Sequence, residues 1–498
     1  MFFVFFMLLT CVSLALLVYL RYKYNYWHSR GVKQLNTHFL LGNFPQVNSI
    51  HLSDLLHEIY STFKNRTQIA GAYVLTKPIA VVLDLDVAKS ILIKNFNKFC
   101  DRNQHNFEDK DPLSGHLFNM TDEKWRSLRA KLTPTFTSGK MKFMFPTIVG
   151  VARQQELAFA ELVANSSDGV VELHDIMGRY TTDIIANCAF GLECNSLKES
   201  DEEFRRVGRI LFYSNESHVW WRFFKMNNMQ VLKWFGLKVV NQDVSDFIMR
   251  VVPETVTMRE QQNIQRKDFL NLLIQLRNSK DMNGLPCLSI EQVAAQVFLF
   301  FLAGFETSSS NMSYGLFELA RNPLVQERLR TEISDVLDRN GGQLTYEAMM
   351  EMTYLDQTIT ETLRKYPALS ALTRIAAENF TIPGTTTTLE KGTTVFIPVR
   401  EIHYDPEIYE NPHEFNPDRF SPEQMQSRHP QAFLGFGDGP RNCIGLRFGR
   451  MQVRVGLIML LKSFRFSVSA RTPEKLELSK HSLVMVPGDG VWVKAERL

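Results

Sequence analysis

The 498-residue sequence lacks several features that would assign it quickly to a class of proteins. It has no C-x-x-C pair, and its few cysteines lie far apart, so a disulfide framework is a poor interpretation of so long a chain. It has no G-x-G-x-x-G segment after an expected strand and no P-loop, which argues against a bound nucleotide. The formal net charge is only +3 with cations and anions interspersed, which argues against nucleic acid as a partner.

Long linkers and repeats are also missing. No stretch rich in Pro, Gly or Ser and no block of like charges divides the chain after residue 50, and no segment repeats itself. The chain is 45% hydrophobic and 22% charged, as in ordinary globular proteins. We therefore expect residues 51–498 to form a single domain.

Charge is absent from the first twenty residues, MFFVFFMLLTCVSLALLVYL. A helix of this length rises about 30 Å and can cross a bilayer. A cleaved signal peptide is the alternative, but the basic start, the shorter apolar run and the small-residue cleavage site are not visible. Basic residues follow from Arg21 to Lys33, and no acidic residue precedes Asp54. We predict a membrane anchor at 1–20 and a basic linker at 21–50, with the remaining chain on the cytoplasmic side.

Most of the remaining chain has helical patterns. One segment begins at Ser289 with Gln292 three residues later, which is a capping box, and stops before Pro323. Its first half, Val293–Phe305, is apolar all round except for Gln296, which predicts a helix buried inside the protein.

A second, shorter helix is predicted at 352–366 because Pro367 ends the pattern. Strand signals are weaker: residues 71–84 suggest a hairpin and residues 393–399 one further strand. We therefore predict a fold that is mainly α with a minor β portion.

One cysteine has an unusual setting, the segment LGFGDGPRNCIGLRFG at 434–449. The apolar run from Ile444 onward predicts a helix, so Cys443 should lie near a helix N-terminus, where the dipole and free N–H groups favour a thiolate. Arg441 adds positive charge, and nearby glycines permit close backbone approach. Such a thiolate could be a nucleophile, a redox thiol or a metal ligand. We expect the other five cysteines to be buried and inert: Cys11, Cys100, Cys188, Cys194 and Cys287.

These alternatives are separated by what each one needs. A nucleophile needs a histidine partner and a redox thiol needs a resolving cysteine, and no pattern in the sequence supplies either. A thiolate bound to haem iron needs no other protein ligand on its own side, and it donates electron density that favours O–O cleavage.

The residues Phe436, Gly439, Arg441, Cys443 and Gly445 form the pattern F-x-x-G-x-R-x-C-x-G. This pattern resembles the haem-binding signature of cytochrome P450 monooxygenases. The resemblance implies haem b with Cys443 as the axial ligand of the iron, held between a long central helix and the cysteine loop. It also implies contacts of Phe436 and Gly445 with the haem.

Further motifs occur in the order of the same family. Trp125 and Arg129 are spaced i,i+4 and leave one helix face. Taken alone they would suit a surface pair. The resemblance implies that both reach a haem propionate, and that Arg374 and Arg441 hold the propionates as well.

The segment Ala303–Ser308 places polar side chains inside the apolar helix, which costs free energy unless they find partners. By resemblance, Gly304 would leave a gap through which O2 approaches, Thr307 would hydrogen-bond that oxygen, and Glu306 would help to deliver protons through water. The alternative is a satisfied polar pair with Thr307 bonded back to its own helix.

A further motif, Glu361-x-x-Arg364, could be a surface ion pair worth a few tenths of a kcal/mol. The family joins such a pair to a later arginine, here Arg419. The resemblance therefore implies a structural clamp for the cysteine loop.

Electrons would come from a partner, because the chain has no nucleotide site of its own. The resemblance implies NADPH-cytochrome P450 reductase with its FAD and FMN, with cytochrome b5 as a second donor. Arg447, Arg450 and Arg454 follow the cysteine at helical spacing and would form a basic stripe for an acidic partner. A merely solvated basic face is the alternative.

Aromatic and basic residues gather in the segment 209–240, a composition that suits the membrane interface, with core packing as the alternative. By analogy with the family, the candidate residues of the substrate pocket are Phe118, Phe212, Phe301, Leu369 and Leu483.

The motifs look most like the insect microsomal branch that handles plant toxins and insecticides. The resemblance implies O2- and NADPH-dependent hydroxylation or epoxidation of lipophilic compounds at the endoplasmic reticulum membrane. A dedicated biosynthetic oxidase of a lipid or terpenoid is an alternative. A non-catalytic haem-thiolate sensor is another, against which Glu306 and Thr307 argue. Three departures from the family stand out: Gly435 replaces a usual proline, the segment 31–45 lacks the prolines expected after the anchor, and YPALSAL at 366–372 lacks those expected after the short helix.

Overall fold

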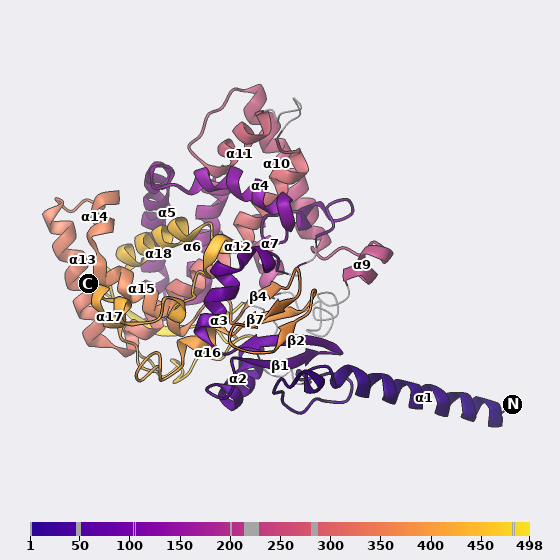
Figure 1. The fold of residues 1–498 in the computed structure, drawn as a ribbon. Helices are drawn as coiled ribbons and strands as arrows, with labels where there is room; N and C mark the ends of the chain where they lie inside the picture. Colours follow the sequence, from indigo (N-terminus) through magenta and orange to yellow (C-terminus); the bar gives the residue numbers. More distant parts are fainter. Residues whose placement is uncertain are drawn as a thin grey trace.

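A computed structural model of the protein describes residues 2–45, 51–102, 104, 106–199, 202–213, 229–279, 287–480, 482 and 484–498. The chain forms a mainly helical body with a small β region at one edge, and the N-terminal helix α1 projects away from it (Figure 1). The predicted fold class, mainly α with a minor β portion, is confirmed. The candidate pocket residue Leu483 lies outside the described residues.

The described helices are α1 (Phe2–Tyr24), α2 (Leu52–Phe63), α3 (Leu85–Lys89), α4 (Asp122–Leu132), α5 (Ser138–Ala164), α6 (Leu173–Ile185), α7 (Glu203–Tyr213), α9 (Met229–Phe235), α10 (Gln242–Gln261), α11 (Phe269–Asn278), α12 (Ile290–Arg321), α13 (Pro323–Arg339), α14 (Tyr346–Glu351), α15 (Thr353–Lys365), α16 (Val399–His403), α17 (Pro422–Ser427) and α18 (Leu446–Leu461). The described strands are β1 (Ile69–Val74), β2 (Lys77–Val82), β3 (Val170–Glu172), β4 (Leu372–Ile375), β5 (Phe380–Thr381), β6 (Thr388–Leu389), β7 (Thr394–Ile397), β8 (Phe464–Ser467) and β9 (Trp492–Arg497).

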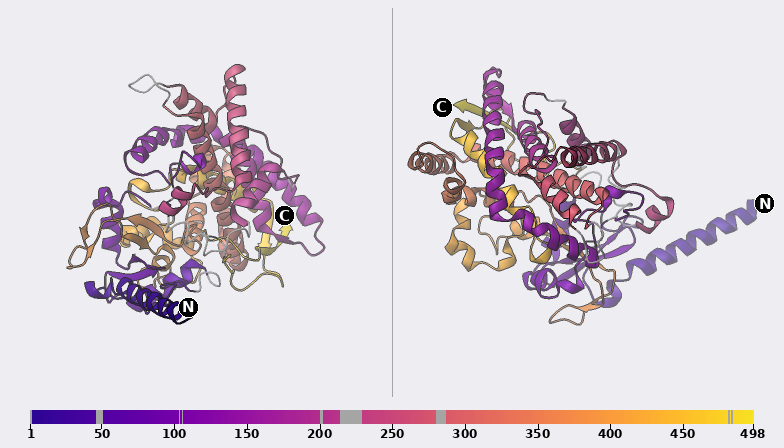
Figure 2. Two further views of the ribbon diagram at one scale, coloured as in Figure 1. Left: turned by 90° about the vertical axis from the view of Figure 1, so that its right-hand side faces the viewer. Right: turned by 90° about the horizontal axis from the view of Figure 1, so that it is seen from above.

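The helix α1 has the composition and length of a membrane span. It belongs to a 29-residue helical stretch whose most apolar 18 residues have a mean hydropathy of 2.6 and are only 6% buried. The central helix α12 also passes a test of length and hydropathy, but 78% of its most apolar window is buried inside the protein. A buried core helix is therefore the better description of α12, as the sequence predicts. By contrast, α1 exposes its apolar side chains and projects from the body (Figures 1 and 2).

The helix α12 begins and ends where the sequence predicts. The Ser289 hydroxyl accepts from the N–H of Gln292 at 3.2 Å, and the Gln292 side chain accepts from the N–H of Ser289 at 3.0 Å, which completes the capping box. Pro323 starts the next helix, α13, so α12 stops at Arg321. The helices α6, α10, α15 and α18 pack around α12 and bury its apolar surface in the main hydrophobic core.

The β region positions one predicted site residue. The strands β1 and β2 form the predicted hairpin, β2 pairs parallel to β7, and β7 pairs antiparallel to β4. Arg374 lies in β4 opposite Val395. A second core cluster, formed mainly by α2 and this sheet, fixes β4.

The cysteines depart partly from the prediction. Cys100 and Cys188 are buried as expected, but Cys194 and Cys287 are only partly buried, and Cys11 is exposed on α1. The prediction is wrong for Cys11 because α1 leaves the body, where no protein core covers it. Cys443 is also exposed, although neighbouring side chains are not.

Candidate active site

The cysteine loop is held in a tight backbone path. A short helical turn at Gly439–Arg441 precedes Cys443, and α18 begins three residues after the cysteine. The N–H of Cys443 donates to the carbonyl of Phe436 at 2.9 Å. Gly439 has a φ of +70°, and a Cβ at this position would collide with the carbonyl of Leu92. Only glycine therefore fits this turn without strain.

The Cys443 sulfur lies near the N-terminus of α18, as predicted, and accepts a hydrogen bond from the N–H of Gly445. Cys443 lies deep in the protein, and the resulting loss of solvation raises its pKa above the usual value, although a pocket leaves its side chain accessible. The hydrogen bond from Gly445 and the charges of Arg129 and Arg102 act to lower the pKa. A metal ion bonded to the sulfur would add the positive charge that favours a thiolate. A pocket of about 220 Å³ opens at this sulfur, lined also by Arg129, Phe136 and Ile444.

The middle of α12 exposes part of one face although the helix is otherwise buried. Ala303 is exposed, and Gly304 and Thr307 are partly buried, whereas Phe305 and Glu306 are buried. The amide of Gln452 in α18 donates to the carbonyl of Gly304 at 3.0 Å, which ties α12 to the helix that follows the cysteine. The Thr307 hydroxyl donates to the carbonyl of Ala303 at 2.6 Å. The backbone-bonded alternative for Thr307 is thus the arrangement in the protein, with the side chain on the exposed face.

Gly304 is also required for helix packing. A Cβ at this position would lie 2.5 Å from Cδ1 of Ile185 in α6. The sequence analysis assigned the glycine to the approach of O2, and the close contact with Ile185 is a second reason for a residue without a side chain.

Arginines from four different segments gather near Cys443: Arg102, Arg129, Arg374 and Arg441. Burial, together with the charge of Arg441, lowers the pKa of Arg374 to about 10, and burial lowers that of Arg441 to about 10. Burial, together with the charges of the other three, holds the pKa of Arg102 well below its usual value. The cluster therefore favours bound anions.

The described protein groups neutralise and hydrogen-bond these four arginines only in part. Asp101 forms an ion pair with Arg441 at 3.1 Å, and no other carboxylate pairs with the four arginines among the described residues. Arg374 donates to the carbonyl of Thr373 at 2.8 Å, yet its buried Nε has no hydrogen-bond partner in the described part of the chain. Three positive charges remain after Asp101, and two carboxylates would balance two of them. The propionates of haem are such a pair, so the residues present fit this cofactor.

Arg441 and Arg129 have further contacts that fix the loop. The Arg441 guanidinium lies 4.1 Å from the ring centroid of Trp125 and donates to the carbonyl of Cys100 at 2.8 Å and to that of Met120 at 2.7 Å. Arg129 donates to the carbonyl of Asn442 at 3.0 Å and to its side-chain oxygen at 2.9 Å. Trp125 is 3% exposed, so the surface-pair alternative does not describe it.

Sequence reasoning did not identify Arg102. Its guanidinium donates to the carbonyl of Arg441 at 2.7 Å and lies 4.1 Å from the ring centroid of Phe118. No local motif surrounds it, and its position near Cys443 depends on a contact across 339 residues.

The predicted clamp is buried and hydrogen-bonded. Arg364 binds Glu361 in a fork, with Nε and Nη2 at 2.7 and 2.8 Å from the two carboxylate oxygens, and both side chains are 0% exposed. The third member, Arg419, lies 3.6 Å from Glu361. The surface-pair alternative is therefore wrong for this motif.

A histidine that sequence reasoning missed connects the clamp to the cysteine loop. His403 Nδ1 contacts the carbonyl of Arg364 at 3.0 Å, and Nε2 accepts from the N–H of Leu434, the first residue of the loop, at 2.9 Å. These two contacts fix a neutral ring with its proton on Nδ1. Burial lowers the pKa of His403 to about 3.

Glu306 is turned away from the exposed face of α12. Its carboxylate lies 2.8 Å from Nε2 of His174 in α6, and the hydroxyl of Ser310 donates to it at 3.0 Å. It is 1% exposed. The sequence indicated the carboxylate but not its partner, which is 132 residues away.

The candidate pocket residues differ in their surroundings. Phe118, Phe212 and Leu369 are partly buried, and Leu369 forms an isolated bridge with Val484. Phe301, by contrast, is fully buried against Phe190 and other aromatic rings. The helical phase that exposes Ala303 turns Phe301 into the core, so its assignment to the pocket is corrected.

The predicted basic stripe on α18 is not a free surface. Arg450 and Arg454 both pair with Asp356 of α15, at 2.9 and 2.5 Å. Only Arg447 of the three is exposed, and it contacts the carbonyl of Phe136 at 3.4 Å. Helical spacing in the sequence could not reveal Asp356.

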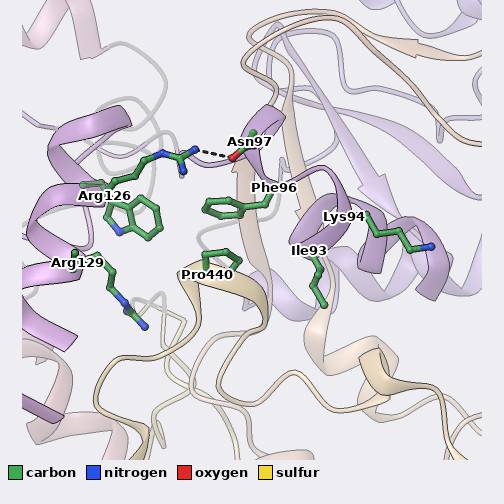
Figure 3. A pocket seen from close by; sticks show the side chains of 9 residues that line it. Ile93, Lys94, Phe96, Asn97, Arg126, Arg129 and Pro440 are labelled. Carbon is green, nitrogen blue, oxygen red and sulfur yellow. Dashed lines mark hydrogen bonds between the residues drawn. The ribbon is translucent and has the colours of Figure 1, made fainter. Parts of the chain in front are cut away.

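Another basic surface lies beside the cysteine loop. A groove of about 450 Å³ is lined by Lys94, Arg126 and Arg129 together with the apolar side chains of Ile93, Phe96, Trp125, Ala130 and Pro440. Figure 3 shows Arg126 and Arg129 on one wall, Pro440 of the cysteine loop below, and Lys94 and Ile93 on the other side. Arg126 donates to Asn97 at 2.8 Å across the groove (Figure 3).

The thiolate candidate, the arginine cluster and the exposed face of the central helix together define a haem-thiolate protein. Comparison with known families agrees, because the cytochrome P450 family model matches residues 33–493. The chain belongs to the cytochrome P450 family and is therefore a haem-thiolate monooxygenase.

The most similar proteins include several insect cytochromes P450. The chain is 44% identical over 487 residues to probable cytochrome P450 6a14 of Drosophila melanogaster, covering 95% of this chain and 96% of that protein. It is 42% identical over 493 residues to cytochrome P450 6A1 of Musca domestica, covering 98% and 96%. It is 43% identical over 509 residues to cytochrome P450 6a2 of Drosophila melanogaster, covering 100% of both. The resemblance to an insect branch is thus confirmed.

Proposed function

We propose that this cytochrome P450 hydroxylates or epoxidises lipophilic small molecules with O2 and NADPH. Plant toxins and insecticides form one class of substrate, and endogenous lipids or terpenoids form the other. When bound, haem supplies the activation of O2. One oxygen atom enters the substrate, and two electrons and two protons reduce the other to water. The observation that carries the proposal is the exposed Cys443 sulfur beside four arginines that lack enough anions.

The position of each residue in the structure suggests its role in the reaction. Cys443 would ligate the iron, with the N–H of Gly445 on its sulfur. Arg102, Arg129 and Arg374 would hold the propionates, since charged forks suit carboxylates. On α12, the Thr307 hydroxyl lies on the exposed face and donates its proton to the carbonyl of Ala303, so it would accept a hydrogen bond from the site and could donate one only after leaving that carbonyl.

We propose that electrons enter at the groove beside the cysteine loop. Its three cations surround an apolar floor, which suits an acidic flavoprotein with an apolar tip, such as NADPH-cytochrome P450 reductase, or cytochrome b5. Arg447 is the exposed member of the α18 set and extends the same positive surface.

We propose that α1 anchors the protein in the endoplasmic reticulum membrane with the domain on the cytoplasmic side. A second apolar surface supports this orientation: on α9, Trp234 and Phe235 are 85% and 68% exposed. Figures 1 and 2 show α9 on the side of the body from which α1 projects. The part of the aromatic segment at 214–228 lies outside the described residues. An exposed aromatic surface beside a membrane helix suits the bilayer interface and would admit lipophilic substrates.

The test is a carbon monoxide difference spectrum of the reduced protein beside that of Cys443→Ser. A strongly red-shifted Soret band in the wild type that is lost in the variant supports thiolate-ligated haem. If the haem-supplied wild type lacks this band, the proposal is wrong. Turnover over a panel of lipophilic compounds then separates the substrate classes: oxidation of many unrelated compounds indicates detoxification, and oxidation of a single one indicates biosynthesis.

A further inference from the structure

The carboxylate of Glu306 is held from outside its own helix. His174 in the first turn of α6 places Nε2 at 2.8 Å from Oε1 of Glu306. The hydroxyl of Ser310, one turn further along α12, lies 3.0 Å from the same oxygen and 3.3 Å from His174 Nε2. Three groups on two helices therefore share one contact region.

This pairing is required by burial. The side chain of Glu306 is 1% exposed and that of His174 is 10% exposed. A buried carboxylate without a partner costs several kcal/mol, so an opposing charge or a bound proton must accompany it. The His174 imidazole can provide either, because its proton lies at hydrogen-bonding distance from the carboxylate.

The pair lies next to the reactive face without facing it. Glu306 precedes Thr307, and one helical residue turns the chain by about 100°. Thr307 is on the exposed face of α12, whereas Glu306 points to α6. About 10% of the His174 side chain remains accessible, so this end of the pair can exchange protons with solvent.

Charged groups on every packed element act on His174. Glu306 on α12 and Glu172 at the start of α6 raise its pKa, and Arg205 on α7 lowers it. Arg205 is itself paired with Asp175 of α6 at 2.8 Å, and the neutral phenol of Tyr314 lies near Glu306 on α12. Burial lowers the pKa of His174, but Glu306 and Glu172 outweigh this effect and Arg205, so the pKa lies above its usual value. The raised pKa of His174 favours an imidazolium beside the Glu306 carboxylate, so the histidine can hold the proton that the pair shares.

We propose that His174 is the positioning residue of Glu306 and resupplies it with protons. In each transfer the N–H bond at Nε2 breaks and an O–H bond forms on Glu306. The protonated Glu306 side chain then rotates toward the Thr307 face of α12, where its proton passes to water, and solvent reprotonates His174. The inference deepens the proposed monooxygenase function and rests on it.

The test compares His174→Gln with His174→Lys in the haem-loaded full chain. Product formed per NADPH and peroxide released are measured between roughly pH 6 and 9, across the range in which a histidine titrates. In the wild type, product per NADPH should fall as the pH rises through the pKa of His174. His174→Gln should give on the order of tenfold less product per NADPH, with no pH step, since positioned proton transfer contributes at least that much. His174→Lys should restore most of the product, because the charge is kept, but without the pH step.

A second readout does not depend on turnover. A pKa raised in the folded protein gives stability below the unfolded value that is lost as the pH rises through the folded value. The thermal midpoint of the wild type should therefore fall over this range relative to that of His174→Lys. The double variant Glu306→Gln with His174→Gln should form as much product per NADPH as Glu306→Gln alone, because His174 acts through Glu306.

His57→Gln is the matched control. His57 Nδ1 lies 2.5 Å from Glu401, so the variant removes a histidine–glutamate pair far from the site, and product per NADPH should not change. If His174→Gln does not retain haem, Ser310→Ala removes one contact of the pair and should lower the product in the same direction. The proposal is overturned if His174→Gln keeps the wild-type profile, or if His174→Lys fails as fully as His174→Gln. The carbon monoxide spectrum and turnover of the wild type report separately on the proposed function.

Discussion

At the scale of single residues, the site holds more positive charges than the protein's own carboxylates neutralise. Four arginines near Cys443 share one carboxylate partner, Asp101, among the described residues. Each buried guanidinium would be costly to bring so close to the others without an anion. We therefore expect the protein to retain haem less well when one of these arginine charges is removed.

Arg102→Gln tests this dependence. The variant removes a charge-assisted contact worth about 1.5–3 kcal/mol, so haem should leave the protein roughly ten- to a hundredfold faster. The measurement is transfer of haem to an acceptor protein in stopped-flow or slow absorbance experiments. Arg126→Gln, on the outer wall of the groove, is the comparison, and its haem should leave at the wild-type rate. Equal rates for wild type and Arg102→Gln would contradict the assignment.

The clamp gives a second prediction at this scale. Arg364→Lys removes the fork to Glu361 and its bond to the carbonyl of His403 (2.8 Å) in a fully buried setting. We expect a loss of about 3–5 kcal/mol in the free energy of unfolding, as for other broken buried pairs. Urea unfolding followed by tryptophan fluorescence measures it. Arg328→Lys, at the exposed pair with Asp418, should change this free energy by less than about 1 kcal/mol.

At the scale of elements, the sequence predicts those parts whose signals are local. The ends of α12 follow from Ser289, Gln292 and Pro323, and the cysteine loop follows from its glycines. Partners that meet across long sequence separations leave no such pattern. The sequence therefore did not reveal the roles of His174, His403 and Arg102. Helical spacing alone predicts a basic stripe on α18, but Asp356 forms ion pairs with two of its arginines.

Gly439→Ala tests whether the cysteine loop needs glycine at the turn before Cys443. The positive φ and the collision with the Leu92 carbonyl should prevent the turn before Cys443, with a cost of at least about 1–2 kcal/mol. The expected result is a protein with a lower thermal midpoint and little thiolate-type carbon monoxide spectrum. Gly449→Ala is the control within α18, since nothing lies within 4 Å of its Cβ position, and it should be neutral or slightly stabilising.

At the scale of the whole molecule, three buried histidines make the fold sensitive to acid. Burial lowers the pKa of His116 and of His403 to about 3 and that of His51 to about 4. Between these values and the unfolded value near 6.5, the unfolded chain binds more protons than the native one. Stability should therefore fall as the pH drops from about 6.5 toward 4.

The predicted slope is at most ~1.4 kcal/mol per pH unit for each histidine. Urea midpoints at stepped pH values measure it. His116→Asn, which keeps a polar side chain without the titration, should give a shallower slope. A wild-type midpoint that stays constant over this range would contradict the prediction.

The order of the site residues along the chain has a consequence for synthesis. Arg102 and Arg129 emerge early, yet they bind Arg441 and Asn442, more than 300 residues later. The strand β9 pairs with β3, which precedes it by more than 300 residues. The arginines near Cys443 can thus meet their partners only after residues 441–442 have been synthesised, long after α1 is available to the membrane. Until then the nascent chain has apolar surfaces without their native partners, so we expect folding of this protein to depend on chaperones.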